Sequence, residues 1–293
     1  MQRMNVIITA QLAGRRVESL LKNEFAMSGS YISALKRRPA GILLNGQKAY
    51  TTAIVKEGDM LSAEIADPEG SSRALPMEAE LNIPWQDEYL AVIDKAAGMA
   101  VHRSTRDPHE LTLENAFVAH FPPGENFHPV SRLDRGTTGL MTVAKSGYMH
   151  ERLKRLLHTE HFSREYLGIA LGKVYPAEGR IELPIGMEEG STYKRAVRRD
   201  GAYSLTVYST IEVNSGYTLL RLIPHTGRTH QLRLHMAAIG HPLAGDWLYG
   251  QRQPEIQRPA LHSAELKLRH PITGESIQLH SSLPEDMKKL MYK

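Results

Sequence analysis

A turn-rich segment near residue 70 divides the chain into two parts that must fold around separate cores. The segment reads Asp67-Pro68-Glu69-Gly70-Ser71-Ser72 and holds no large apolar residue, so no helix or strand is expected to pass through it. A chain of 293 residues is long enough for two domains of about 150 residues each. We expect a linker between residues 67 and 80, one domain over 12–70 and a second over 80–293.

The excess positive charge lies entirely in the first part. Residues 1–66 hold nine Lys or Arg and five Asp or Glu, which accounts for the net charge of +4 of the whole chain. A small basic unit joined to a neutral body is expected when the unit binds a polyphosphate. A solvated charged surface explains the same composition, and charge alone does not separate the two interpretations. The basic residues assigned to this surface are Arg15, Arg16, Lys36, Arg37 and Arg38.

Local patterns predict two helices followed by a hairpin in the first part. Val17, Leu20 and Leu21 have helical spacing, and a second helix is predicted over Ser30–Arg38 with its apolar residues inward and its basic end outward. The stretch Ile42–Gln47 reads as a strand that enters an Asn-Gly turn, the strongest short-range hairpin signal.

The second part alternates short strands with few helices. Helices are predicted over residues 148–157 and 229–239, and strands over 91–93, 140–144, 218–223 and 266–268. Because strands and helices do not alternate regularly, the fold class predicted is α+β.

Two features of the composition exclude whole classes of function. The chain has no cysteine, which rules out disulfides, a thiolate nucleophile, iron–sulfur clusters and cysteine-bound zinc. No apolar run approaches the roughly 20 residues of a membrane helix, and the apolar start is too short for a secretory signal. We therefore expect a cytoplasmic protein without a membrane partner.

The densest group of reactive side chains surrounds Asp134, in the stretch His128–Leu140. This Asp has an Arg on either side and precedes a Gly-Thr-Thr-Gly turn and a strand. It either caps the turn through its side chain or is an ionised carboxylate that acts as a nucleophile. The glycines lack the Gly-Lys-Ser/Thr ending of a phosphate loop, and no acidic pair accompanies them for Mg²⁺, so phosphoryl transfer is not expected.

A second group lies in the stretch His225–His235. Arg228 is placed to pair with a distant carboxylate, and Gln231 and His235 share one face of the predicted helix. The three histidines are five residues apart, which is not the i, i+4 spacing of a helical metal site, so no metal is expected. Asp246, between Gly245 and Trp247, is interpreted as a turn former rather than a second catalytic acid.

Ordered motifs in both parts carry a resemblance to known families. Residues 131–140, 227–233, 240–250 and 261–274 resemble the successive signatures of RluA/RluD-type pseudouridine synthases, and the two helices and hairpin over 12–66 resemble the S4 RNA-binding domain. The resemblance implies a pseudouridine-synthase-like catalytic domain with a mixed, mostly antiparallel sheet. Such a domain isomerises uridine in ribosomal or transfer RNA. It implies neither cofactor nor metal, because nothing is oxidised and no group is imported. We expect the enzyme to act as a monomer.

The same resemblance implies a role for each matching residue. Asp134 corresponds to the nucleophile, Tyr166 to the aromatic residue against the target base and Arg228 to the partner of the catalytic carboxylate. Substrate-binding roles fall to Arg132, Leu232 and Gln231.

The chain departs from the family pattern at a few positions, such as Ser131 in place of His and Arg164 in place of Lys. These departures indicate a divergent branch, whose RNA substrate is not implied by better-known members. Two other functions stay open, a non-catalytic RNA-binding or ribosome-assembly factor and a nucleoside hydrolase. The hydrolase needs a second carboxylate that the sequence does not offer.

Overall fold

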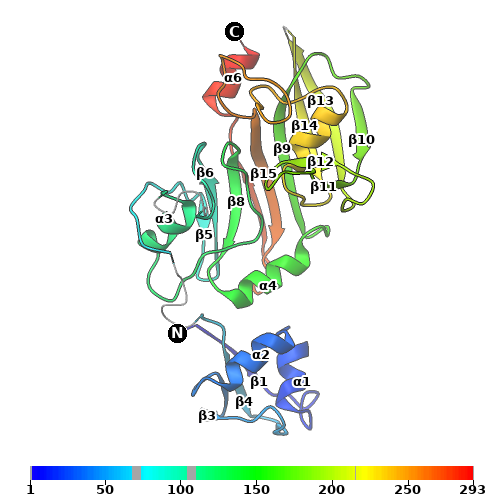
Figure 1. Cartoon of the computed structure of the whole chain (residues 1–293). Coiled ribbons are helices and arrows are strands. Elements are labelled where there is room, and N and C mark those ends of the chain that lie inside the picture. Colours follow the sequence, from blue (N-terminus) through cyan, green and yellow to red (C-terminus); the bar gives the residue numbers. More distant parts are fainter. Residues whose placement is uncertain (1, 68–73, 104–109, 215, 293) are drawn as a thin grey trace.

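The computed structural model describes residues 2–67, 74–103, 110–214 and 216–292, and its two main sheets belong to different parts of the chain (Figure 1). The smaller sheet has four antiparallel strands in the order β1-β4-β2-β3. The elements of this N-terminal unit are β1 (Arg3–Ile7), α1 (Val17–Asn23), α2 (Gly29–Lys36), β2 (Ile42–Leu44), β3 (Gln47–Lys48) and β4 (Met60–Glu64).

The two predicted helices and the hairpin of this unit are confirmed. Helix α1 buries the predicted apolar residues, and α2 buries Ile32 and Leu35 after a Ser28 cap that accepts a hydrogen bond from the Tyr31 amide at 3.1 Å. Asn45 and Gly46 have φ values of 52° and 79°, the left-handed pair that a tight hairpin turn requires.

The predicted start of this unit is wrong, and one of its predicted RNA-contacting residues already has partners within the chain. Strand β1 pairs with β4 from Arg3 to Ile7, so the unit starts before residue 12. The side chains of β1 are only partly buried, and an edge strand of this kind lacks the buried pattern that identifies a strand. Arg38 is not free to face a partner, because it pairs with Glu64 at 3.3 Å and donates to the Ala66 carbonyl at 2.8 Å. The other four basic residues are exposed.

The larger sheet has the strand order β10-β13-β14-β9-β15-β8-β6-β5, with β16 beside β15 and β7 beside β8. Only the β15–β8 pairing is parallel among the described strands. The strands are β5 (Trp85–Gln86), β6 (Leu90–Lys95), β7 (His128–Pro129), β8 (Thr138–Ala144), β9 (Phe162–Leu171), β10 (Glu178–Glu182), β13 (Leu205–Asn214), β14 (Tyr217–Pro224), β15 (Leu261–Arg269) and β16 (Ser276–His280). The predicted mixed, mostly antiparallel α+β fold is confirmed.

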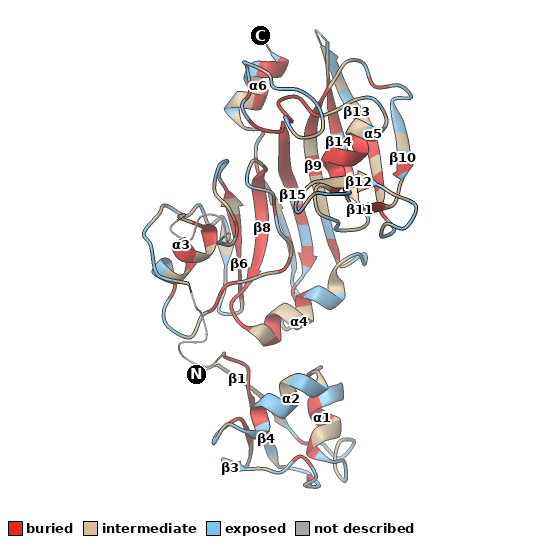
Figure 2. Cartoon of the chain, in the orientation of Figure 1, coloured by how far each residue is buried: buried red, intermediate tan, exposed pale blue. Residues whose placement is uncertain are grey.

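The remaining elements surround this sheet, whose central strands are largely buried (Figure 2). They are the helices α3 (Leu113–His120), α4 (Gly147–Leu156), α5 (Gln231–Ala238) and α6 (Glu285–Met291), and a small sheet of β11 (Ile185–Met187) and β12 (Arg195–Val197). One apolar cluster joins Leu133, Tyr166, Leu222 and Leu232. It therefore connects the loop before β8 to β9, β14 and α5. Among the described residues, no helix has the length and apolar character needed to cross a membrane.

Helix α4 lies between the large sheet and the N-terminal unit (Figure 1). Tyr148 belongs to the apolar core of the N-terminal unit, and its hydroxyl donates to the Phe25 carbonyl at 2.6 Å. Arg152 donates to the same carbonyl at 3.3 Å, and Arg155 donates to that of Ala26 at 3.1 Å. The N-terminal unit is thus docked on α4 by both apolar and polar contacts.

Asp67, the first residue of the predicted linker, makes a second connection between the two parts. Its carboxylate contacts the His128 imidazole at 2.5 Å, accepts from the Asn126 amide at 3.1 Å and accepts from the Gly147 backbone N–H at 3.0 Å. The rest of the turn-rich segment, residues 68–73, lies outside the described residues.

Candidate active site

A cavity of about 840 Å³ opens where the loop before β8 meets β9, α4 and the start of α5. All six residues that the family resemblance assigns to the site line it: Arg132, Asp134, Tyr166, Arg228, Gln231 and Leu232. Long-range sheet pairing brings their segments together, because β15 inserts between β8 and β9. The sequence prediction of one shared site is consistent with this arrangement. The contacts of Asp134, Arg228 and Gln231 differ from those expected.

Asp134 lies in the turn that leads from β7 into β8, with its side chain 28% exposed. Its backbone carbonyl, not its carboxylate, closes the turn by accepting from the Thr137 N–H at 3.0 Å. Gly139 has φ 105° and lies so close to β15 that a Cβ would come within 2.2 Å of the Ser263 carbonyl oxygen. The glycines of the motif therefore allow close packing, and the carboxylate is left free to face the cavity.

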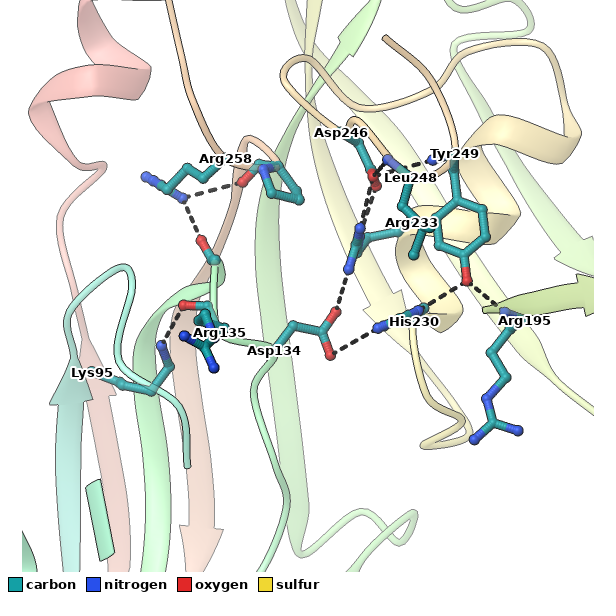
Figure 3. Close-up of polar contacts among 12 residues, drawn as sticks. Lys95, Asp134, Arg135, Arg195, His230, Arg233, Asp246, Leu248, Tyr249 and Arg258 are labelled. Atoms are coloured by element: carbon teal, nitrogen blue, oxygen red, sulfur yellow. Dashed lines mark hydrogen bonds and ion pairs between the residues drawn. The ribbon is translucent and has the colours of Figure 1, made fainter. Parts of the chain in front are cut away.

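The guanidinium that contacts Asp134 belongs to Arg233 on α5 (Figure 3). Its Nη1 lies 3.2 Å from Asp134 Oδ2, while Nε and Nη2 each donate to Asp246 at 2.7 Å. Asp246 is fully buried and also accepts from the backbone N–H groups of Leu248 and Tyr249 at 3.1 and 3.3 Å. Asp246 forms the predicted turn, and it also orients the arginine that faces Asp134.

The expectation that Arg228 pairs with the catalytic carboxylate is therefore wrong. Arg228 is exposed, and its Nε donates to the Tyr203 carbonyl at 3.1 Å. A signal for Arg233 was present in the sequence, because it stands between Leu232 and Leu234 on a helix. A cation among core residues requires a buried carboxylate partner.

Gln231 shapes the loop before α5 instead of offering free groups to a substrate. Its Oε1 accepts from the Thr226 hydroxyl at 2.7 Å and from the Arg228 N–H at 3.0 Å. Its Nε2 donates to the Leu205 carbonyl at 2.9 Å and to the Thr206 hydroxyl at 3.1 Å. Both donors and both acceptor positions of Gln231 are thus used within the chain, and its predicted substrate-binding role stays a prediction.

His230, which the sequence did not single out, approaches Asp134 from the other side (Figure 3). Its Nε2 lies 3.9 Å from Asp134 Oδ1, and its Nδ1 lies 2.9 Å from the Tyr249 hydroxyl, which accepts from the Arg195 N–H at 2.9 Å. The backbone of His230 has φ 57°, a left-handed conformation that is unusual for a residue other than glycine. Such conformations concentrate at functional sites.

Burial sets the charge of the groups around Asp134. Burial lowers the pKa of His230, and the negative charge of Asp134 only partly opposes this effect. Burial acts in the same direction on Arg233, but the hydrogen bonds and charge of Asp246 outweigh it and raise the pKa of that guanidinium. Near neutral pH the carboxylate thus faces one permanent cation and one neutral imidazole.

Two buried cations hold the backbone next to Asp134. Lys95, at the end of β6, donates to the carbonyls of Ala96, Met99 and Arg135 at 2.8, 3.1 and 3.1 Å. Arg258 donates to the Gly136 carbonyl at 3.1 Å (Figure 3). Burial lowers the pKa of Lys95 to about 8, although the charge of Asp134 opposes the shift. Neither residue was identified as part of the site from the sequence.

Tyr166 and Leu232 form an apolar side of the cavity. Both are buried, and both belong to the same cluster as Leu133 and Leu261, which also line the cavity. The arrangement combines a carboxylate with an apolar wall that can hold a flat ring. In the described part of the chain, no group of three or more His, Asp or Glu side chains is placed to hold a metal ion.

Comparison with known proteins agrees with this site. The sequence model described as RNA pseudouridylate synthase matches residues 89–238. An uncharacterized RNA pseudouridine synthase of Bacillus subtilis, YjbO, is 34% identical over 271 residues that cover 92% of this chain and 95% of the relative. Ribosomal large subunit pseudouridine synthase D of Yersinia pestis is 36% identical over 269 residues, which cover 85% and 82% of the two chains.

The fold has a counterpart among solved structures. Human RNA pseudouridylate synthase domain containing 1 aligns with a TM-score of 0.57 and 26% identity, over 69% of this chain and 83% of that chain. Sequence and fold thus agree with the motifs around Asp134. The chain belongs to the RNA pseudouridylate synthase family and is an RNA pseudouridine synthase of the RluA/RluD type.

Proposed function

We propose that this enzyme isomerises uridines of ribosomal RNA, with Asp134 as the nucleophile. The observation that carries the proposal is the ion pair of Asp134 with Arg233, which is itself fixed by the buried Asp246. A nearby permanent cation favours the charged form of a carboxylate, and only that form is nucleophilic. Because the side chain is partly exposed to a cavity of about 840 Å³, a nucleoside can reach it.

The remaining site residues fit the chemistry of the reaction. The C1′–N1 bond of uridine breaks, the uracil turns over, and a C1′–C5 bond forms while C5 loses its proton. Uracil must stay in the site throughout, which the apolar wall of Tyr166 and Leu232 supports. Arg132 is exposed and lines the cavity, so we assign it to the gap that the flipped nucleotide leaves in the RNA.

The charge around the cavity fits RNA as the substrate. Seven Lys or Arg side chains line its described part, but only one acidic side chain, that of Asp134. Phosphate contacts of such cations account for much of nucleic-acid affinity. A relative of 36% identity is named for the ribosomal large subunit, which favours ribosomal over transfer RNA. We place the reaction in the cytoplasm and assign it to a monomer, because one chain supplies every residue named.

The N-terminal unit is proposed to grip the RNA as an S4-like domain. Lys36 and Arg37 extend from the end of α2 into solvent, and Arg16 is exposed beside α1. Arg15 is exposed as well and pairs with Glu24 at 3.3 Å. We leave Arg38 out of the proposed surface, because Glu64 neutralises it.

Replacing the proposed nucleophile tests the reaction. Asp134→Asn keeps the size of the side chain and removes its negative charge, so we expect normal folding and RNA affinity but a loss of pseudouridine formation of at least 10³-fold, an order-of-magnitude estimate. The measurement is pseudouridine mapping of ribosomal RNA from cells that carry either form or none, together with circular dichroism of both proteins. A variant that still isomerises uridine at a near-normal rate excludes Asp134 as the nucleophile.

A further inference from the structure

Five of the seven basic side chains at the cavity have no carboxylate partner among the described residues, and three of these five come from α4, β9 and the loop after β14. Lys154 comes from α4, Arg164 from β9 and Arg228 from the loop between β14 and α5. Arg103 and Arg132 are the other two, whereas Arg233 pairs with Asp134 and Asp246, and Arg135 pairs with Glu110. Even the carboxylate next to Arg164, that of Glu165, pairs elsewhere, with Arg221 at 3.0 Å.

His158 lies among these cations. It follows α4 one helical turn after Lys154, and its backbone has φ 66°, which turns the chain sharply at this point. Its ring lies 3.9 Å from the position that a Cβ of Gly227 would occupy. Burial lowers the pKa of His158, and the positive charges of Arg164 and Arg228 lower it further. His158, Arg164 and Arg228 all line the same cavity.

A concentration of like charge without a counter-charge is unfavourable in the free protein. Two guanidinium groups and an ammonium group line the same cavity as His158, whose pKa is lowered by burial and then by the charges of Arg164 and Arg228. An anion bound at this place relieves the repulsion and accepts hydrogen bonds from every member. Guanidinium, ammonium and imidazolium groups are donors only, so the ligand must be rich in acceptor oxygens and carry negative charge.

We propose that Lys154, His158, Arg164 and Arg228 form a subsite for a backbone phosphodiester of the RNA next to the target uridine, and that His158 takes up a proton when the phosphodiester binds. The proposal rests on the proposed function, because it takes the strand in the cavity to be RNA. It gives Arg228 a role that its exposed position allows. It assigns the phosphate contacts to these four residues, whereas the contacts to the base are assigned to Tyr166 and Leu232 in the same cavity.

The proton uptake follows from electrostatics. In the free protein, the groups that face His158 are Arg164 on β9 and Arg228 and His225 on the loop after β14, while Lys154 lies one turn back on α4. Burial and the charges of Arg164, Arg228 and His225 disfavour the imidazolium, and they outweigh a hydrogen bond to the His225 backbone that favours it. A phosphodiester adds one negative charge beside the ring and favours the imidazolium. By linkage, RNA must then bind more tightly as the pH falls.

Binding of a fluorescently labelled 20-nucleotide oligouridylate, followed by anisotropy with the full-length protein, tests the subsite. Lys154→Gln and Arg164→Gln are each expected to raise the Kd about 3- to 10-fold and to reduce the salt slope by about 0.7, the value for one phosphate contact on a single strand. Lys154→Arg should restore most of the affinity. Lys173→Gln removes an exposed charge on the chain segment after β9 that does not line the cavity, and it should change neither quantity.

The pH dependence tests the proton uptake separately. Wild-type affinity for the oligouridylate is expected to rise several-fold between about pH 7.5 and 5.5. His158→Asn, which tolerates the left-handed backbone, should lose most of this rise and keep its affinity at pH 7.5 within about 2-fold, where the wild-type imidazole is neutral in the free protein. Equal pH dependence in both proteins overturns the role of His158.

The two proposals fail in different ways. If the wild-type chain forms pseudouridine in ribosomal RNA but the Lys154 and Arg164 variants bind the oligouridylate with unchanged Kd and salt slope, the subsite is wrong and the function stands. If pseudouridine mapping finds no site in ribosomal RNA that depends on the wild-type protein, the proposed function is wrong, whatever the binding data show.

Discussion

His230 is held on both sides of its imidazole ring, and these contacts determine which nitrogen carries the proton. The Tyr249 hydroxyl accepts from the Arg195 N–H, and we expect it to direct its own proton to His230 Nδ1. Burial raises the pKa of Tyr249 to about 12, which keeps this proton in place. The neutral ring then carries its hydrogen on Nε2, the nitrogen that faces Asp134 Oδ1 at 3.9 Å. We expect a small movement on substrate binding to close this gap to a hydrogen bond.

Removing the Tyr249 hydroxyl tests this arrangement. In Tyr249→Phe the ring stays beside the Arg233 guanidinium, 5.3 Å from its centre, but nothing fixes the tautomer of His230. We expect kcat to fall about 10-fold with KM unchanged, because one of the contacts that orient Asp134 is lost. Tyr50→Phe, at a side chain that is 82% exposed, is the matched control. An unchanged kcat, or a change confined to KM, contradicts the role of His230.

The sequence could reveal a site residue only where its role depends on a short local motif. Asp134 stands in a compact motif, and Tyr166 and Leu232 were assigned through the family resemblance. The partner of Asp134 is separated from it by 99 positions, and the sequence alone offered two arginines in the same short stretch. Only the fold distinguishes them, because Asp246 is buried beside Arg233 and not beside Arg228. His230 was missed because its approach depends on a left-handed backbone that no local pattern indicated.

At the scale of elements, the turn that carries Asp134 is held by residues at or near the ends of neighbouring strands. Lys95 closes β6 and supplies three N–H donors to three carbonyl oxygens, one of which belongs to Arg135, directly after Asp134. Arg258 fixes the next carbonyl and is itself held by Asp286 at 2.7 Å. The turn is thus fixed through its backbone, and its side chains stay available for the RNA.

This arrangement predicts an alkaline limit to activity. The pKa of Lys95 is about 8, and above it the amine keeps only two N–H donors for three carbonyls while its lone pair repels the third. We expect kcat to fall as the pH rises through about 8, whereas binding of RNA changes little. Lys95→Met should be at least 10-fold less active at pH 7 and should lack this step. Lys173→Met, an exposed control, should keep the wild-type profile. A wild-type kcat that stays constant from pH 7 to 9.5 contradicts the prediction.

The elements themselves could be predicted better than their arrangement. Apolar runs correctly indicated β6, β8, β14 and β15, because a buried strand is a local pattern. Their order in the sheet is not local, since β15 enters between β9 and β8 from more than 90 residues further along the chain. That insertion places Leu261 beside the turn that carries Asp134. No local sequence pattern indicated the insertion. The parallel pairing of β15 with β8 was likewise beyond local patterns.

At the scale of the whole molecule, the N-terminal unit is attached to the wall of the active site. Helix α4 contacts Phe25 and Ala26 on one side and contributes Lys154 to the cavity on the other. Asp67 joins the end of the N-terminal unit to His128, which also lines the cavity. The sequence indicated a linker from composition, and composition could not show that its first residue is a fixed contact. If the N-terminal unit grips RNA as proposed, these contacts fix the orientation in which it presents the RNA to the cavity.

Asp67→Asn tests how much this connection stabilises the molecule. Burial alone would raise the pKa of Asp67, but hydrogen bonds from His128 and the Gly147 N–H outweigh it and hold the pKa below its usual value. A carboxyl group with a lowered pKa stabilises the folded state above its unfolded-state pKa and loses that contribution as the pH falls through the folded-state pKa. We expect the variant to lose about 1–2 kcal/mol in the free energy of unfolding at pH 7, measured with urea.

The difference between wild-type and Asp67→Asn proteins should then shrink below about pH 4, because the wild-type carboxyl also loses its charge there. Glu57→Gln removes an exposed carboxylate of the same N-terminal unit and should leave the stability within about 0.5 kcal/mol of wild type at both pH values. A constant difference between pH 7 and 3.5 means that the charge of Asp67 adds nothing to the contact. In that case the apolar packing around Tyr148 alone orients the N-terminal unit, and RNA affinity should be insensitive to Asp67→Asn.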